Sequence, residues 1–312
     1  MNQKHISVLT NEAINILNIQ KNGVYLDLTL GNGGHSSEIL KIIKNGQGKL
    51  FAFDVDDQAI KASEKILSKI SKNYEIIHSN YNDFESELLK RKITKVDGIL
   101  MDLGVSQIQL NGSRGFSYNI DSKLDMRMDQ NNDNLKTAEF IVNNYSERQL
   151  REIFIKNADE EDAYKIAKNI VKIRSKKHIN TTFELVNIIK KSKIFRKINK
   201  HPAKKVFQAI RIEVNDELNI LYNTLPKLLN FLNKNGVLAV ISFHSLEDRI
   251  VKYFFNNCTR CFGDRNDDQR KTAKKVFEYM LLTKRVITPN IKEIQNNHSA
   301  KSAKLRAIKK IF

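Results

Sequence analysis

The sequence predicts an α/β fold that is interrupted by an all-helical insert. Strand and helix signals alternate over the first hundred residues, which is typical of βαβ units on a parallel sheet. The alternation stops after Asp102, and only loop and helix signals follow until a buried-strand pattern returns at 236–243. Strands on both sides of a helical block indicate an insertion into one domain. We therefore expect that domain at residues 1–112 and 215–312, and the insert at 113–214.

The expected elements follow from the spacing of apolar residues along the chain. Short apolar runs predict four strands before the insert, at 24–30, 49–54, 74–78 and 96–102. Between these runs, helical spacing predicts helices at about 34–44, 57–70 and 84–91. In the insert and leading out of it, the same spacing predicts helices at 135–143, 146–155, 160–173, 182–191 and 204–232. Two edge strands are expected near the C-terminus, at 277–282 and 305–311.

The charge of the chain predicts a polyanionic partner. Lys and Arg number 53 against 35 Asp and Glu, which gives a net charge of +18, and nucleic acid is the usual partner of such a protein. Two basic runs without an acid, 163–178 and 188–205, both lie in the insert. They predict a phosphate-binding surface there, and the alternative is a solvated helix face. The candidate RNA contacts in the second run are Lys190, Lys191, Lys197 and Lys200.

Other features of the sequence exclude several classes of protein. The best candidate for a membrane span, the apolar run 237–241, has five residues, whereas a span needs about 18. The N-terminus lacks the apolar region of a secretory signal, and two cysteines cannot form a disulfide framework. These observations predict a cytoplasmic protein without a membrane partner. Cys258 and Cys261 form a lone C-x-x-C motif with no further zinc ligands obvious nearby, so we expect no metal.

A glycine-rich turn marks the expected ligand site. Gly31-Asn32-Gly33-Gly34 follows the first strand and opens a helix, at the position where backbone approaches a ligand closely. Three details favour S-adenosylmethionine over a nicotinamide cofactor. They are the G-x-G-G spacing, the acid Asp27 ahead of the turn, and Asp54 at the end of the second strand, where it can accept hydrogen bonds from both ribose hydroxyls. The alternative is a tight turn with a capping aspartate.

Candidate catalytic and RNA-binding residues lie at and beyond the fourth strand. Asp102 ends that strand, at the sheet edge where ligands and substrates meet, and its carboxylate can orient an amine and receive its developing charge. His244 follows the buried strand, where it can contact the substrate or shuttle a proton. The alternative is a structural histidine that ties the strand end to Glu247. Arg114 and Arg127 either hold phosphates or form salt bridges within their loops.

Four long motifs stand in an order that resembles one bacterial family. They are DGILMDLGVS at 97–106, RGFS at 114–117, LDMRMD at 124–129 and SFHSLEDRIVK at 242–252. Shorter matches at 207–212, 215–218 and 302–306 extend the resemblance over essentially the whole chain. On these motifs the chain is similar to the ribosomal RNA small subunit methyltransferase H family, also called MraW.

The resemblance implies a Rossmann-like, class I methyltransferase that depends on S-adenosylmethionine and carries an inserted all-helical domain. It implies transfer of a methyl group to the exocyclic N4 amine of a cytidine in the decoding centre of 16S rRNA. The implied partner is the small ribosomal subunit, and DNA is not expected to bind. Carried over position by position, the cofactor contacts are Gly33, Gly34, His35, Asp54, Tyr81, Asp102 and Gln109.

The chain departs from the family pattern at a few positions. Tyr81 replaces a usual Phe, and stacking against the adenine should survive that change. Ser7 replaces a Pro, and Gln107-Ile108 replaces Ser-Pro ahead of Gln109, so the loop geometry there is open. Lys204-Lys205 replaces Thr-Arg, which keeps positive charge but loses the guanidinium fork.

Two rival functions come from different classes of protein. One is a DNA amino-methyltransferase, but such enzymes commonly show a Pro-Pro-aromatic tetrapeptide after the fourth strand, and residues 102–105 read DLGV here. The other is a non-catalytic RNA-binding factor for ribosome assembly that keeps the fold of a methyltransferase. Calorimetric titration with S-adenosylmethionine separates the second rival, because a degenerate fold should bind no cofactor.

Overall fold

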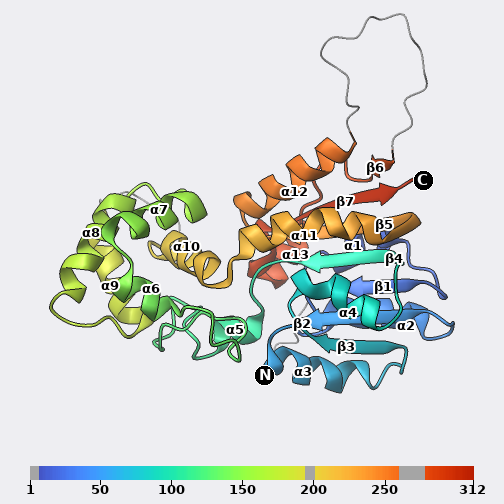
Figure 1. The fold of residues 1–312 in the computed structure, drawn as a ribbon, viewed down its shortest axis with the longest axis horizontal. Helices are drawn as coiled ribbons and strands as arrows, with labels where there is room; N and C mark the ends of the chain where they lie inside the picture. The colour runs from blue at the N-terminus through green and yellow to red at the C-terminus, as the bar shows by residue number, and fades with distance from the viewer. Residues whose placement is uncertain (1–6, 194–200, 260–277) are drawn as a thin grey trace, which may run out of the picture. The chain divides into compact units, whose positions relative to one another are not determined.

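The computed structural model describes residues 7–193, 201–259 and 278–312. The chain forms two compact units, Met1–Gly104 with Ile220–Phe312, and Val105–Asn219 (Figure 1). Lys197, Lys200 and Cys261, which we singled out in the sequence, lie outside the described residues. The domain boundaries expected at 112 and 214, and the RNA contact expected of the insert, stay predictions.

The first unit is built on a seven-stranded sheet in the order β3-β2-β1-β4-β5-β7-β6. The strands are β1 Val24–Asp27, β2 Lys49–Asp54, β3 Tyr74–His78, β4 Val96–Asp102, β5 Leu232–Ser242, β6 Tyr279–Leu281 and β7 Lys304–Lys310. The first five strands pair in parallel, and β7 is antiparallel to β5 and β6. This sheet confirms the predicted α/β class. The chain runs outward from β1 to β3 and then returns to β4, which places a topological switch point between β1 and β4.

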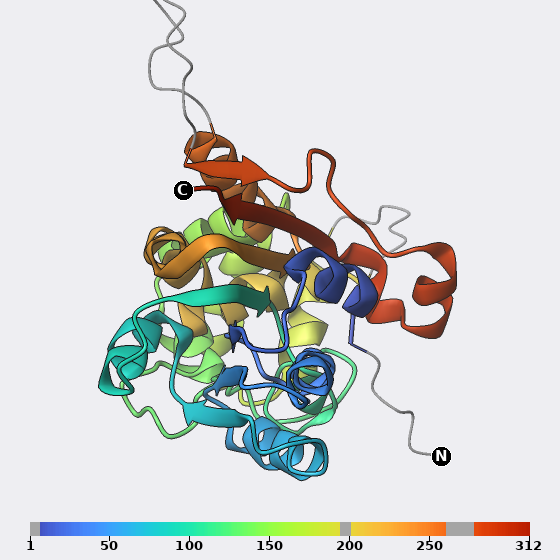
Figure 2. The ribbon, with the colours of Figure 1, turned by 90° about the vertical axis from the view of Figure 1, so that its right-hand side faces the viewer.

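Helices cover both faces of this sheet because neighbouring strand residues point to opposite sides. The helices of this unit are α1 Thr10–Leu17, α2 Gly34–Ile43, α3 Asp57–Leu67, α4 Phe84–Lys90, α11 Glu217–Phe231, α12 Ser245–Cys258 and α13 Ile291–Asn296. Tyr25 shares a buried cluster with residues of α2 and α3, whereas Leu26 shares one with residues of α4, α11 and α12. Figure 2 shows the blue helices α1 and α2 on one side of the sheet and the teal helix α4 on the other.

The bounds of β1 and β5 differ most from those expected. β1 ends at Asp27 and not at residue 30, because the N–H of Thr29 donates to the Asp27 side chain and the chain then enters the glycine turn. β5 begins at Leu232, four residues before the expected start, because Leu232 already pairs with Val96 across a register shift. The two strands expected near the C-terminus are present as β6 and β7, but the edge position expected for both is wrong for β7, because β7 pairs with β5 on one side and with β6 on the other.

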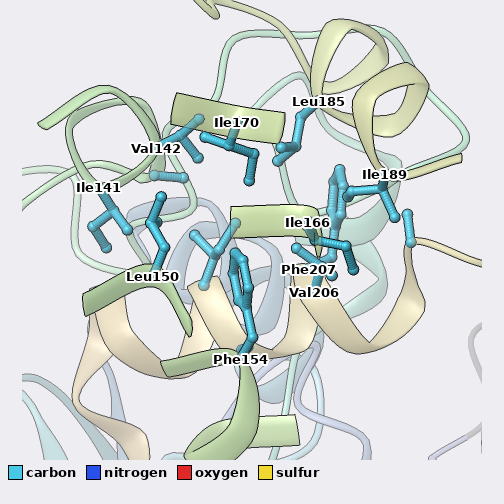
Figure 3. Close-up of a cluster of buried hydrophobic side chains, with 14 of the residues drawn as sticks. Ile141, Val142, Leu150, Phe154, Ile166, Ile170, Leu185, Ile189, Val206 and Phe207 are labelled. Atoms are coloured by element: carbon cyan, nitrogen blue, oxygen red, sulfur yellow. The ribbon is translucent and has the colours of Figure 1, made fainter. Parts of the chain in front are cut away.

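The second unit contains six described helices around a core of its own. They are α5 Gln107–Asn111, α6 Ala138–Asn144, α7 Glu147–Ala158, α8 Ala163–Arg174, α9 Thr182–Ser192 and α10 Lys204–Asn215. Figure 3 shows that Phe154, Ile166, Leu185 and Phe207 come from four different helices and meet in this core. Capping boxes at Ser146 and Thr181 fix where α7 and α9 begin.

The long helix expected at 204–232 is wrong, because the chain breaks at Asp216, whose φ of 50° is left-handed. The side chain of Asn215 causes the break. Its amide donates to the Met126 carbonyl at 2.8 Å, and its oxygen accepts from Met128 N–H at 2.8 Å, so the end of α10 is tied to a distant loop. Aspartate tolerates the left-handed conformation that follows. Among the described residues, no helix of either unit is long and apolar enough to cross a membrane.

Candidate functional site

A left-handed turn joins β1 to α2 at the switch point. Gly31 and Gly33 adopt φ values of 49° and 74°, which favour glycine. A methyl group on Gly33 would also lie 3.1 Å from the side chain of Ser63. The N–H of Gly33 donates to the Leu30 carbonyl at 2.8 Å, which closes the turn. The turn brings backbone to the start of α2, at the sheet edge where ligands bind in this class of fold.

Asp54 ends β2 beside this turn. Its Oδ2 accepts a hydrogen bond from Gly31 N–H at 2.8 Å, and its Oδ1 accepts one from Asp56 N–H at 3.0 Å. Burial raises the pKa of Asp54 from 3.8 to about 6, and the two backbone bonds oppose the rise. Because each carboxylate oxygen can accept more than one hydrogen bond, Asp54 can hold the turn and still accept from ribose hydroxyls.

Asp102 ends β4, which pairs with β1 on the side opposite to β2. Its N–H donates to Thr29 Oγ1 at 2.6 Å, which ties β4 to the turn. Its Oδ2 lies 3.5 Å from Nδ1 of His35, whose ring is buried. Its Oδ1 is also buried and has no hydrogen-bond partner among the described residues. A buried carboxylate oxygen without a partner is costly, so a bound ligand is expected to complete it.

The protonation of Asp102 depends on burial and on three neighbouring side chains. Burial raises the pKa of Asp102 from 3.8 to about 6. His35 opposes this rise, and the carboxylates of Asp27 and Glu247 add to it. Asp102 is therefore mostly charged at neutral pH, and its pKa is close enough to neutrality for it to take up and release a proton.

Asp27, ahead of the turn, is engaged within the protein. Its side chain is 0% exposed, and its two oxygens accept from Ser36 Oγ at 2.6 Å and from Thr29 N–H at 3.1 Å. These bonds support Thr29, which in turn accepts the hydrogen bond from Asp102 N–H. A ligand contact by Asp27 stays a prediction.

Two buried oxygens at the site are available to accept hydrogen bonds from a ligand. Asn32 Oδ1, in the turn, and Asp102 Oδ1 are both without a partner within the described ranges of the chain. They belong to the carboxyl edge of the adjacent strands β1 and β4. An ammonium group offers three donors and no acceptor, and S-adenosylmethionine carries such a group, so these residues fit that cofactor. Sequence reasoning did not single out Asn32, and its place between two glycines of the turn was the available signal.

Two further predicted cofactor contacts lie in different units. Tyr81 opens a short 3-10 turn, Tyr81–Asp83, after β3 and packs against the buried cluster that contains Leu26. Gln109 lies in α5 of the second unit, where its Oε1 accepts from Ser106 N–H at 3.0 Å in a capping box. Both residues stay predicted contacts.

His244 caps the helix that follows β5. Its Nδ1 accepts from Glu247 N–H at 3.4 Å, and its Nε2 lies 3.1 Å from Glu247 Oε1. In return, Glu247 Oε2 accepts from the N–H groups of Phe243 and His244. These contacts correspond to the alternative in which the histidine ties the strand end to Glu247. A catalytic role for His244 stays a prediction.

Arg114 and Arg127 are both engaged within the loop before α6. The guanidinium of Arg127 binds both carboxylate oxygens of Asp125, at 2.8 and 3.1 Å. Arg114 is buried, and its Nη2 donates to the carbonyls of Arg127 and Met128 at 2.7 and 2.8 Å. These bonds brace the loop, which is the alternative to phosphate binding, and RNA contact by either arginine stays a prediction.

The lysines predicted to bind RNA are described only in part. Lys190 and Lys191 are exposed in the last turn of α9. In the other basic run, the exposed lysines Lys165, Lys168 and Lys172 recur on α8, and Lys176 and Lys177, also exposed, follow that helix. Free Cys258 is half-buried, and the other cysteine of its motif lies outside the described residues.

Comparison with known proteins identifies one family. The family model described as the MraW methylase family matches residues 2–311. The ribosomal RNA small subunit methyltransferase H of Spiroplasma kunkelii is 49% identical over 100% of both chains. The protein of the same name from Mycoplasma capricolum is 46% identical over 98% of this chain and 99% of its own. A solved rRNA methylase from Streptococcus thermophilus aligns with 97% of this chain and 94% of its own, at 11% identity and a TM-score of 0.43, and no conclusion rests on that likeness.

Proposed function

This chain belongs to the MraW methylase family, and from that premise we propose that it methylates the N4 amine of a cytidine in the decoding centre of 16S rRNA. It is a methyltransferase that depends on S-adenosylmethionine, on an α/β fold of the Rossmann-like class. The names of its full-length relatives support small-subunit ribosomal RNA as the substrate. The choice of the N4 atom rests on the resemblance of the motifs at 97–106 and 242–252.

The observation that carries this proposal is the unpaired oxygen of Asp102. Oδ1 is buried at the end of β4, at the sheet edge where the cofactor and the substrate are expected to meet. S-adenosylmethionine supplies a methyl group that its sulfonium charge activates. The glycine turn would let backbone approach that cofactor, Asp54 would accept from its ribose, and Asn32 would accept from its ammonium. Asp102 Oδ1 has two candidate donors, the same ammonium and the amine of the cytosine.

The chemistry of the amine defines what Asp102 has to do. The N4 lone pair of cytosine is shared with the ring, so the amine attacks poorly and has to be aimed in line with the methyl group. Positive charge develops on N4 as the new bond forms. A carboxylate that accepts a hydrogen bond from N4 therefore stabilises the transition state more than the ground state. The methylated amine then loses one proton, and Asp102, with a pKa of about 6, can accept it.

The charge of the protein supports an RNA substrate. The net charge is +18, and exposed lysines gather on α8 and at the end of α9. Contacts from lysines to phosphates would position the RNA without reading its sequence. We assign the activity to the cytoplasm, with the small ribosomal subunit as the partner.

Mass spectrometry of 16S rRNA nucleosides tests the proposal in cells. A strain that lacks this protein should lose one N4-methylated cytidine, and the wild-type gene should restore it. An unchanged amount of N4-methylcytidine in the deletion strain would overturn the substrate or the position. Restoration by Asp102→Asn to the wild-type level would instead overturn the part that we assign to Asp102.

A further inference from the structure

His35 contacts two separate segments of the first unit. Its ring lies in the first turn of α2 and is 4% exposed, and its Nε2 lies 3.0 Å from the carbonyl oxygen of Val8. A carbonyl oxygen can only accept a hydrogen bond, so Nε2 carries a proton. Nδ1 is then the nitrogen that faces Asp102, at 3.5 Å from Oδ2.

This geometry calls for a proton between His35 and Asp102. If neither side carried one, the lone pair of Nδ1 would face a carboxylate oxygen, and two acceptors repel each other. A proton on either atom removes the repulsion, and the pair is then an imidazolium beside a carboxylate or an imidazole beside a carboxylic acid. The position of this proton decides how much negative charge Asp102 presents.

The other charged neighbours of Asp102 act against its ionised form. Asp27 on β1 and Glu247 on α12 both raise the pKa of Asp102, and His35 on α2 lowers it. Asp27 is paired with Ser36 and Thr29, and Glu247 accepts from backbone N–H groups at the start of α12. Within the described part of the chain, His35 is thus the titratable neighbour that favours a charged Asp102.

The segment that carries the Val8 carbonyl, the partner of His35 Nε2, is also fixed in place. The N–H of Leu9 donates to Glu293 Oε1 at 2.7 Å, and Leu9 adopts a left-handed φ of 52°. A methyl group on Gly34 would lie 1.8 Å from Ser7 Oγ, so the segment 7–9 packs directly against the glycine turn. His35 cannot turn away from Asp102 without losing its hydrogen bond to this segment.

We propose that His35 is a positioning residue for methyl transfer: anchored on Val8, it keeps the Asp102 carboxylate charged and leaves Oδ1 for the substrate amine. This inference rests on the proposed function. In the step it serves, the bond from N4 to the methyl carbon forms while the bond from sulfur breaks and leaves its electron pair on sulfur. The proton of N4 passes to Asp102 Oδ1. In this step His35 does not touch the amine and acts on it through Asp102.

The pH dependence of methyl transfer in His35→Gln tests this role. Glutamine keeps a donor for Val8, but it cannot carry the second proton. In the wild type, the single-turnover rate at saturating cofactor and RNA should fall below about pH 6, where Asp102 becomes protonated. Loss of the adjacent positive charge should move that fall to about pH 7. The variant should then be roughly fivefold slower at about pH 6 and within about twofold of the wild type at about pH 8.5. An unchanged profile, or a rate lowered equally at every pH, would overturn the role.

Two further variants make the test specific. His78→Gln is a matched control, because His78 Nε2 lies 3.1 Å from the Val55 carbonyl and its Nδ1 lies 3.5 Å from Asp57 Oδ1, but both side chains are nearly half exposed. This control should leave the pH profile unchanged. In the background of Asp102→Asn, His35→Gln should change the rate by less than about twofold, since its partner is already neutral. A full effect in that background would assign His35 to some other group and overturn the proposal.

A measurement on the wild type covers the case in which His35→Gln does not fold. Nitrogen NMR of histidine-labelled protein should show a proton on Nε2 of His35 from about pH 5 to about pH 8.5, and the Nδ1 signal should change in Asp102→Asn. A proton on Nδ1 alone, or an Nδ1 signal that Asp102→Asn leaves unchanged, would overturn the contact between His35 and Asp102. The proposed function fails separately, if the wild type transfers no methyl group to 16S rRNA. The role of His35 fails if the wild type is active and glutamine leaves its pH profile unchanged.

Discussion

Three carboxylates at the carboxyl edge of the sheet differ in how their oxygens are paired. Both oxygens of Asp27 and both oxygens of Asp54 accept hydrogen bonds from within the protein. Asp102 keeps one buried oxygen without a partner among the described residues. Because buried polar atoms are paired almost everywhere in native proteins, the unpaired atom marks Asp102 as a carboxylate with an acceptor left for a ligand.

Asp102→Asn should slow methyl transfer strongly. The amide keeps the shape and one acceptor, but it removes the negative charge that would stabilise positive charge on the amine. We expect the rate to fall by about a hundredfold or more, the usual scale for a lost electrostatic contact in a transition state. The affinity for S-adenosylmethionine should fall much less, and RNA binding should hardly change. Single-turnover transfer of a labelled methyl group measures this rate. A near-normal rate would restrict Asp102 to binding, and His244 would be the next residue to substitute.

The same substitution should stabilise the protein in the absence of ligand. The pKa of Asp102 is raised from 3.8 to about 6 in the folded chain, so the folded state holds this proton more tightly than the unfolded state. The free energy of unfolding therefore falls as the pH rises from about 4 to about 6, and Asp102→Asn removes that loss. We expect the variant to be about 1–3 kcal/mol more stable at pH 7, with the difference closing toward pH 4. Urea unfolding at several pH values measures it, and a less stable variant at pH 7 would contradict the buried charge.

Asp54→Ala should weaken cofactor binding. The substitution would leave two ribose hydroxyls unpaired and also free the N–H groups of Gly31 and Asp56, so we expect a loss of about 1.5–3 kcal/mol in binding free energy. In the wild type, affinity should fall as the pH drops through about 6, where protonation removes acceptors from Asp54. Asp57→Ala, at a half-exposed carboxylate nearby, is the matched control. Calorimetry that finds equal affinity in both variants would remove Asp54 from the site.

At the scale of elements, the sheet that carries the site could be predicted from the sequence. β2, β3 and β4 have the bounds that their apolar runs indicated, because buried parallel strands read as uninterrupted apolar segments. The glycine turn, Asp54 and Asp102 stand at the ends of such runs. Their meeting at one edge follows from the parallel arrangement alone.

Several contacts could not be predicted from the sequence, because they join residues of different elements or loops. The hydrogen bond from His35 to Val8 depends on how the N-terminal segment packs against the turn. The burial of Asp27 depends on Ser36 from the following helix. The break between α10 and α11 depends on the contact of Asn215 with Met126, 89 residues away. Periodicity reports which face of an element is buried and does not report its partner.

Charge reversal at the end of α9 tests the RNA-contacting role of the helical insert. Lys190→Glu with Lys191→Glu should weaken RNA binding by about tenfold or more and lower the salt slope of binding by about 1.5, because two phosphate contacts are lost. Affinity for S-adenosylmethionine should not change. Lys61→Glu with Lys65→Glu, on exposed positions of α3, makes the same change of net charge in the first unit. Equal weakening by both pairs would reduce the effect to net charge and contradict a defined RNA surface.

At the scale of the whole molecule, the second unit is inserted in sequence between two strands that pair in the sheet of the first unit. β4 and β5 pair in parallel, with Asp102 opposite Ile241, although all of Val105–Asn219 lies between them in sequence. The last residue of β4 is thus both the end of a central strand and the start of the path into the helical unit. Cofactor binding is expected to depend mainly on the first unit and RNA binding on the second, so the variants above should separate the two affinities.

Transfer of a deuterated methyl group to small ribosomal subunits tests the central claim most directly. The full-length protein is incubated with S-adenosylmethionine labelled at the methyl group, and the nucleosides of the 16S rRNA are then analysed by mass spectrometry. We predict that the label appears in N4-methylcytidine at one site, and that Asp102→Asn yields about a hundredth as much in the same time. Label on a ring carbon or on a ribose oxygen, or no labelled nucleoside at all, would contradict methyl transfer to the N4 amine of a cytidine.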